Sequence, residues 1–247
     1  MRAARFSRTL GLCGLMLAAT GLSGCVAALP LAASGMLAKR TVEDKGEAAV
    51  AVPEEVAVVM PTPNLTEKWF AAALFASDRA GTGLSVLPDP AASNDDEPVL
   101  PCHGGKPAIL IDLDPGIAAF RPEAGPFVAQ PGLAPALATA RAAETEVLWI
   151  SILGEAREAE LRAVLAETGL DPAGEDTFLL IRDPAETKTQ RRNAAAGEWC
   201  ITAIVGDRRG DFDEFMDYLR DPDAPTPFDP LLDSGWFELP PPIRAAA

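Results

Sequence analysis

Several common catalytic signatures are missing from this sequence of 247 residues. The chain has a single histidine, His103, so no second imidazole is available to share a metal ion, and no two of its four cysteines are spaced Cys-x-x-Cys. It contains no glycine-rich phosphate loop, no Gly-x-Ser-x-Gly elbow and no internal repeat. These absences exclude a paired-histidine metal site, a P-loop and a serine-hydrolase elbow as the source of an activity.

Positive charge is also scarce. The sequence has 21 lysines and arginines against 36 acidic residues, a formal net charge of −15. A field of this sign disfavours a polyanion such as nucleic acid, and it favours a dispersed domain without an obligate protein partner. It is compatible with a small substrate whose phosphate is neutralised locally by a metal ion and a lysine.

Residues 1–24 resemble a bacterial lipoprotein signal peptide. Three arginines precede an uncharged stretch from residue 10, and Leu22-Ser23-Gly24-Cys25 resembles the lipobox, in which the cysteine is diacylated and becomes the mature N-terminus. Removal of residues 1–24 would lower the formal charge from −15 to −18, because it takes away three arginines and no acids. The alternative is an uncleaved membrane anchor, since the uncharged stretch continues to residue 37, although Pro30 interrupts it.

The residue after the lipobox indicates a destination. By resemblance to lipoproteins of Gram-negative bacteria, an aspartate after the cysteine would retain the protein in the inner membrane, and this chain has Val26 there. We therefore expect a lipid anchor in the outer membrane, with the protein facing the periplasm.

The rest of the chain divides by composition. Residues 25–64 mix small apolar residues, charges and prolines without a sustained period, which predicts a tether. Residues 65–100 predict a helix over 65–79, with a buried stripe of Trp69, Phe70, Ala73 and Leu74, followed by a loop over 81–101 that is rich in glycine, proline and serine. Residues 101–247 form the main domain and end in a proline-rich tail.

Within the main domain, short apolar runs alternate with helical patterns. Strands are predicted at 108–112, 147–151, 177–181, 201–205 and 236–239, and helices at 131–143, 155–168, 186–196 and 210–220, with Gly169 ending the second helix. Strands that are almost wholly apolar and separated by helices indicate a parallel sheet covered on both faces. The predicted fold class is a Rossmann-like α/β domain.

Polar residues follow the predicted strands. Asp112 and Asp114 come after 108–111, Ser151 ends 147–150, and Asp207 and Asp211 come after 201–205, while Lys188 lies near the start of a helix. Ligands of open parallel sheets bind at the carboxyl ends of the strands. Any one of these acids is more often a turn residue or a helix cap. Together they predict an oxygen-rich pocket for a divalent cation, with an aspartyl nucleophile.

The same register places two cysteines at the other end of the sheet. Cys102 precedes Asp112 by ten residues and Cys200 precedes Asp207 by seven. If both aspartates end neighbouring parallel strands, the cysteines lie near the entrances of those strands. A disulfide between them is predicted for an oxidising compartment, and two unpaired thiols are the alternative.

The order of these motifs resembles the haloacid dehalogenase superfamily of phosphohydrolases, and most closely its secreted class B and C acid phosphatases, several of which are lipoproteins. The resemblance covers roughly residues 100–242. The resembling segments are Ile109-Leu110-Ile111-Asp112-Leu113-Asp114, Trp149-Ile150-Ser151, Lys188-Thr189-Gln190-Arg191, Gly206-Asp207-Arg208-Arg209-Gly210-Asp211-Phe212 and Gly235-Trp236-Phe237-Glu238-Leu239-Pro240.

The resemblance implies a role for each residue. Asp112 would attack phosphorus, and Asp114 would protonate the leaving alcohol and then help to deprotonate water. Ser151 and Lys188 would bind the phosphoryl oxygens. Magnesium would be held by Asp112, the Asp114 carbonyl and Asp207, and Asp211 would orient Lys188 or a metal-bound water.

Two positions depart from the pattern of the family. Pro115-Gly116 replaces Glu-Thr or Gly-Thr, and proline restricts the conformation of Asp114. Ile152-Leu153 stands where relatives often have Asn-Arg. Arg208 and Arg209, which are unusual in this loop, could be phosphate ligands or a solvated pair. The segments between the motifs leave room for little or no cap domain, so we expect an open site.

These observations predict a magnesium-dependent phosphomonoesterase of the acid phosphatase type, which acts on a small phosphomonoester through an aspartyl phosphate. A phosphotransferase would need only an alcohol in place of water. The alternative from another class is a non-catalytic envelope lipoprotein that keeps the fold as a binding module, and the two departures favour it.

Overall fold

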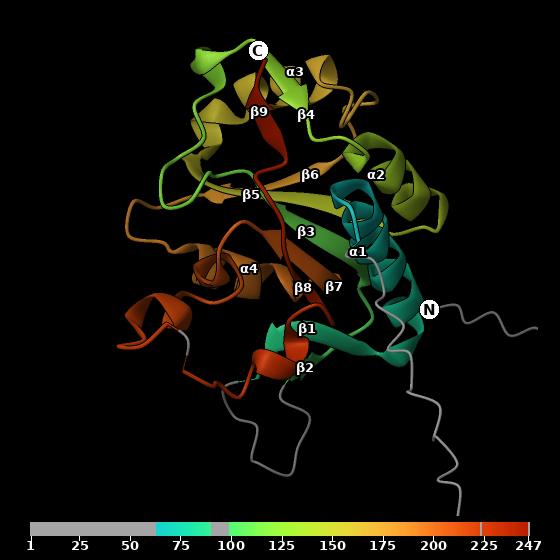
Figure 1. The fold of residues 1–247 in the computed structure, drawn as a ribbon, viewed down its shortest axis with the longest axis vertical. Helices are drawn as coiled ribbons and strands as arrows, with labels where there is room; N and C mark the ends of the chain where they lie inside the picture. The colour runs from blue at the N-terminus through green and yellow to red at the C-terminus, as the bar shows by residue number, and fades with distance from the viewer. Residues whose placement is uncertain (1–62, 90–98, 223, 247) are drawn as a thin grey trace, which may run out of the picture. The chain divides into compact units, whose positions relative to one another are not determined.

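The computed structural model describes residues 63–89, 99–222 and 224–246 (Figure 1). The predicted signal peptide, Cys25 and all but the end of the predicted tether lie outside these residues. No helix of the described ranges is long and apolar enough to cross a membrane.

The centre of the fold is a five-stranded sheet in which all strands are parallel. Its order is β6 (Thr177–Ile181), β5 (Glu146–Gly154), β3 (Lys106–Asp112), β7 (Trp199–Gly206) and β8 (Trp236–Glu238). The central strand β3 is buried from Ala108 to Asp112 because both of its edges and both of its faces are covered. The predicted Rossmann-like α/β fold is confirmed.

Three helices cover one face of this sheet: α1 (Leu65–Arg79), α2 (Leu133–Ala142) and α3 (Glu158–Glu167). Their apolar residues pack in one cluster with Ile109, Ile111 and Trp149 of the sheet. The other face packs in a second cluster with α4 (Lys188–Ala195) and with the antiparallel pair β1 (Leu84–Pro88) and β2 (Val99–Pro101). The alternation of inward residues along β3 between these clusters follows from the period of two of a strand.

Some boundaries are as predicted, and the predicted stripe of the first helix is partly wrong. The helix 65–79 begins with a capping box, in which Asn64 accepts from the Glu67 amide and the Glu67 side chain accepts from the Asn64 amide. Trp69 and Ala73 are buried as expected, but Leu74 is 49% exposed and the stripe continues instead through Ala72 and Ala76.

Two further predictions of secondary structure are wrong. The segment 81–101, predicted as a loop, contains β1 and β2. The predicted helix 210–220 is two short 3-10 turns, Arg209–Asp211 and Glu214–Tyr218. The side chain of Asp213 caps the second turn by accepting from the Phe215 amide, so local side-chain hydrogen bonds replace the α-helical ones.

No domain is inserted between the motifs in the described part of the chain. After Asp114 there is only a 3-10 turn, Pro122–Ala124, and the short strand β4 (Phe127–Ala129), before α2 begins. Strand β4 pairs with β9 (Ile243–Ala245), so the end of the chain lies beside the loop that follows Asp114 (Figure 1). This connectivity agrees with the expectation of little or no cap domain. In the described part of the chain, no inserted domain covers the carboxyl end of the sheet.

Candidate active site

The six residues predicted for the site meet at the carboxyl end of the central strands. Asp112 is the last residue of β3, Ser151 lies in β5, Lys188 is the first residue of α4, and Asp207 follows β7. Asp114 and Asp211, the other two of the six, join these four residues in one hydrogen-bonded network. The parallel register brings together residues that are as many as 99 positions apart in sequence, from 112 to 211.

Lys188 is the centre of this network. Its ammonium group donates to Asp112 Oδ2 and lies 3.5 Å from Asp114 Oδ2 and 3.4 Å from Asp211 Oδ1. Its side chain is only 12% exposed. The capping box of Thr187 and Gln190 fixes the start of α4, and so fixes where Lys188 leaves the backbone.

Asp112 is buried and strongly held. Its Oδ2 accepts from Lys188, and its Oδ1 accepts from the amide of Asp114 at 2.8 Å. Burial raises the pKa of the Asp112 carboxyl and the charge of Asp114 adds to this rise, while Lys188 opposes both. The contact with Lys188 favours the ionised form, which is the form that a nucleophile requires.

Asp114 accepts three hydrogen bonds. The Ser151 hydroxyl donates to Oδ1 at 2.7 Å, the Phe120 amide donates to Oδ1 at 2.9 Å, and the Ile152 amide donates to Oδ2 at 2.7 Å. These donors fix the position of the carboxylate between the ends of β3 and β5. The proton of the fully buried Ser151 is thus directed to Asp114, and to donate to a phosphoryl oxygen the hydroxyl must turn away from it.

Asp211 closes the other side of the site. Its Oδ2 accepts from the amides of Asp207 and Arg208 at 3.0 and 3.1 Å, so it shapes the loop after β7. Burial, and then the charge of Asp112, raise the pKa of Asp211 to about 8. Lys188 responds in the opposite sense: burial lowers its pKa, but the charges of Asp112, Asp211 and Asp114 outweigh burial and leave the pKa above its ordinary value. Lys188 is therefore a cation at neutral pH.

The chemistry of the donors fits a divalent cation. Four carboxylates meet at the site, against the ammonium group of Lys188 and the guanidinium of Arg208, which is 3.9 Å from Asp211 and also bonded to Asp217. Burial and the charges of neighbouring carboxylates raise the pKa values of Asp112 and Asp211, and a hard cation with oxygen ligands would favour their ionised forms. The residues therefore fit magnesium.

The predicted ligand set is not preformed. No three acidic, histidine or cysteine side chains of the described residues are gathered in a metal-binding arrangement. Both oxygens of Asp207 accept from the Gly116 amide, at 2.9 and 3.1 Å. Since a carboxylate has about four lone-pair sites, Asp207 keeps acceptor capacity beside this contact.

Sequence reasoning missed a buried arginine under the site. Arg192, one helical turn after Lys188, is 1% exposed and donates to the Asp211 carbonyl at 2.7 Å and to Thr189 Oγ1 at 3.0 Å. It connects α4 to the loop that carries Asp211, and burial lowers its pKa. No motif singled it out, because two adjacent arginines in a polar helix are typical of a solvated face.

Arg208 and Arg209, in the loop after β7, have different positions. Arg208 lines the pocket above the site and pairs with Asp217. Arg209 donates to the carbonyl of Pro222 at 3.3 Å and does not line this pocket. Arg208 and Arg209 were expected to be either phosphate ligands or a solvated pair. Arg208 is near enough to the site to act on a substrate, but its guanidinium is already paired with Asp217.

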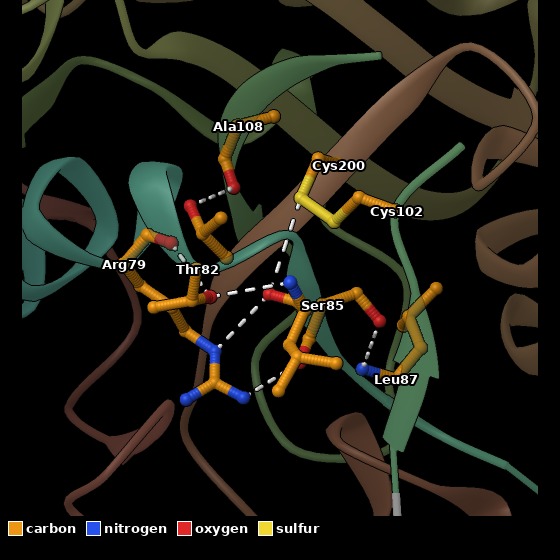
Figure 2. Close-up of a disulfide and its surroundings, with 9 residues drawn as sticks. Arg79, Thr82, Ser85, Leu87, Cys102, Ala108 and Cys200 are labelled. Atoms are coloured by element: carbon orange, nitrogen blue, oxygen red, sulfur yellow. Dashed lines mark hydrogen bonds between the residues drawn. A yellow bond between two sulfur atoms is a disulfide. The ribbon is translucent and has the colours of Figure 1, made fainter. Parts of the chain in front are cut away.

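The disulfide lies at the start of β7, beside β1 (Figure 2). Cys102 and Cys200 are bridged with their Cα atoms 5.1 Å apart, as predicted from the register of β3 and β7. The bridge packs against β1, where Arg79 donates to the carbonyls of Leu84 and Ser85 at 3.3 and 2.9 Å. It ties the entrance of β7 to the end of β2, far along the strands from the carboxylates.

No family model and no curated protein matches the sequence. The fold is similar to that of a class C acid phosphatase. One similar solved structure is that of the class C acid phosphatase from Bacillus anthracis, with a TM-score of 0.47 and 16% identity, over 72% of this chain and 78% of that chain. A likeness at this level of identity concerns the fold, and the function proposed below is drawn from the side chains of the site.

Proposed function

We propose that the protein is a phosphomonoesterase that acts through an aspartyl phosphate on Asp112. The observation that carries the proposal is the contact of a buried aspartate, at the end of the central strand, with a lysine ammonium group that also faces Asp114 and Asp211. A carboxylate that is held in place and kept ionised by a cation can attack phosphorus, while the same cation stabilises the charge that develops on the phosphoryl oxygens.

The reaction has two displacements. In the first, Asp112 Oδ forms a bond to phosphorus, the bond from phosphorus to the alcohol oxygen breaks, and that oxygen takes a proton from Asp114. In the second, Asp114 accepts a proton from water, the water oxygen bonds to phosphorus, and the Asp112 carboxylate leaves. The three hydrogen bonds to Asp114 hold its carboxyl group in one place for both proton transfers.

Ser151 and Lys188 are the proposed phosphate ligands. Lys188 would remain a cation throughout, because its pKa is raised by three carboxylates. Ser151 would exchange its contact with Asp114 for a phosphoryl oxygen, and the Ile152 and Phe120 amides would keep Asp114 in position.

Magnesium would be held by the carboxylates of Asp112 and Asp207 and by the main-chain carbonyl of Asp114, with Asp211 orienting the groups around it. When bound, it would neutralise the phosphate and polarise it toward attack. This supply of positive charge would complement Lys188 in a protein whose net charge is −15.

We also propose a lipid anchor at Cys25 and a position in the cell envelope, in the outer membrane and facing the periplasm. The support is the lipobox-like segment and Val26, which lie outside the described residues. The disulfide is consistent with an oxidising compartment.

A non-catalytic binding module is the second candidate. The contact of both Asp207 oxygens with the Gly116 amide favours it, because Pro115-Gly116 is where the sequence departs from the phosphatase pattern. A binding module would bind phosphate or magnesium at this site without turnover.

Phosphate release by the full chain from a panel of phosphomonoesters, with magnesium and with a chelator, distinguishes the candidates. Asp112→Asn should abolish turnover and remain folded, whereas the matched control Asp78→Asn, at an exposed position of α1, should turn over as the wild type does. Rapid quenching of the wild type should yield protein carrying one phosphoryl group, and the Asp112→Asn protein should carry none. Absence of turnover in the wild type with every substrate, combined with binding of magnesium, would favour the binding module.

A further inference from the structure

Exposed apolar side chains gather at the mouth of the proposed active site. Five large hydrophobic residues of the described chain are exposed, and three of them line one pocket: Ile117, Ile152 and Tyr218, which are 83%, 43% and 84% exposed. The other two, Leu74 and Phe215, do not line this pocket. Scattered single exposed hydrophobic residues need no explanation, but a group around one pocket indicates a contact with a ligand.

These three residues, which we call the apolar rim, reach the pocket from three separate segments. Ile117 lies in the loop that follows Asp114, Ile152 follows Ser151 in β5, and Tyr218 ends the 3-10 turn Glu214–Tyr218. The pocket has a volume of about 330 Å³, and Asp114 and Lys188 also line it. A phosphate held by Lys188 would therefore direct its leaving group toward the apolar rim.

The charges in the same pocket restrict that leaving group. Glu186, Glu214 and Asp217 line the pocket beside the apolar rim. The only basic residues that line it are Lys188, which contacts Asp112, and Arg208, which contacts Asp217. A leaving group with a second phosphate or a carboxylate would thus meet Glu186 and Glu214, while the charge of Arg208 is offset by Asp217 and that of Lys188 by Asp112.

We propose that the apolar rim is a specificity site for phosphomonoesters of apolar, uncharged alcohols, such as alkyl and aryl phosphates. This inference rests on the proposed phosphatase function and names the substrate class of the same site. The apolar rim removes the leaving group from water, and the acids exclude anionic leaving groups. Polar sugar and glycerol phosphates would lack the apolar contact and would be poorer substrates.

The test compares hexyl phosphate with ethyl phosphate, because the two leaving alcohols have nearly the same acidity and differ in apolar length. Each methylene removed from water is worth roughly a factor of four in binding. An open rim covers about half of the four extra methylenes, so kcat/KM of the wild type should be roughly tenfold higher for hexyl phosphate. Phosphoglycolate, in which a carboxylate replaces the methyl group of ethyl phosphate, should be the slowest of the three.

Variants assign the preference to the apolar rim. Ile117→Ser and Tyr218→Ser together should bring the ratio of kcat/KM for hexyl over ethyl phosphate close to one, and most of the change should be in KM for hexyl phosphate. Leu74→Ser, which removes a half-exposed apolar side chain of α1 that does not line this pocket, should leave the ratio at the wild-type value. A wild-type ratio near one, or a ratio that the double variant retains, overturns the proposal. Turnover of phosphoglycolate as fast as ethyl phosphate overturns its electrostatic part.

Failure of the specificity proposal can be distinguished from failure of the proposed phosphatase function. If the wild type hydrolyses none of the three esters, or if Asp112→Asn hydrolyses them as fast as the wild type, the phosphatase mechanism fails and the specificity proposal falls with it. If hydrolysis occurs and depends on Asp112 but shows no preference for hexyl phosphate, the phosphatase proposal stands and the apolar rim is not a specificity site.

Discussion

Asp211→Asn should make the metal-free protein more stable at alkaline pH, although it should impair the proposed activity. Burial and the charge of Asp112 raise the pKa of Asp211 to about 8 in the folded protein, from an ordinary value of 3.8. Because the folded-state pKa is the higher one, the folded protein keeps a proton that the unfolded chain has already lost. The contribution of this group to stability is complete below about pH 4, falls as the pH rises, and is at its lowest above about pH 8.

The size of the effect follows from the interval between the unfolded and folded pKa values of Asp211, 3.8 and about 8. Each pH unit between the two pKa values corresponds to about 1.4 kcal/mol, so the interval gives an upper bound of about 5 to 6 kcal/mol. Asp112 and Asp211 influence each other's protonation, and Asp112 remains in the variant. One substitution should therefore recover about 1 to 3 kcal/mol of this amount.

The experiment is urea unfolding of the wild type and of Asp211→Asn in the presence of a chelator. It measures the free energy of unfolding of both proteins at pH 5 and at pH 9. The carboxamide oxygen of the variant can still accept from the amides of Asp207 and Arg208, so the loop keeps its hydrogen bonds. The difference in the free energy of unfolding between variant and wild type should grow by about 1 to 3 kcal/mol from pH 5 to pH 9. Asp78→Asn, the exposed control, should show no such growth, and a constant difference for Asp211→Asn would refute the reasoning.

Three further predictions concern magnesium, the disulfide and the lipid. Magnesium at about a hundred times its dissociation constant should stabilise the wild type by about 2.7 kcal/mol. Asp207→Asn should lose most of this gain in thermal unfolding, and an equal gain in both proteins would contradict the proposed ligands. Replacing Cys102 and Cys200 together by serine should lower the free energy of unfolding by about 3 to 5 kcal/mol, because the bridge closes a loop of 98 residues. An unchanged denaturant midpoint would contradict a stabilising disulfide. Cys25→Ser should abolish labelling with palmitate, and equal labelling of both proteins, or of neither, would reject the lipobox.

The sequence predicted the central sheet well because its strands have local and unambiguous signals. Residues 177–181 form a short apolar run between polar turns, and the strand was predicted with the observed bounds. The helix 65–79 was also predicted with its observed bounds, and the capping box at Asn64 marks where it begins. Elements of this kind are determined by residues close together in the chain.

The elements that were missed depend on distant partners. Strands β4 and β9 have three residues each and exist because they pair with each other across more than 110 positions. Strand β1 lies in a segment whose glycines and prolines indicate a loop, and its pairing with β2 and its burial against the sheet decide its conformation. Such pairing has no signal in the residues of either strand alone.

The same distinction holds in the site. The residues at the strand ends could be named from the sequence, since the carboxyl ends of parallel strands lie at one edge. Their hydrogen-bond partners could not be predicted from the sequence. The Gly116 amide donates to Asp207 across 91 positions, and the buried Arg192 donates to the Asp211 carbonyl. These contacts depend on side-chain directions and loop conformations that no pattern of residue types specifies.

The position of the disulfide has a consequence for how the protein is made. Between its two cysteines lie β3, β4, β5 and β6, and the pairing of β7 with β3 is what brings Cys200 beside Cys102 in the fold. This is a contact of high sequence separation, which forms late because the loop must close first. If Cys13 is removed with the leader and Cys25 is acylated, as proposed, Cys102 has no other cysteine in the chain with which to pair. Oxidation within one chain could then form only this bridge, and the oxidised fraction of newly secreted protein would measure how much of it has closed the loop from Cys102 to Cys200.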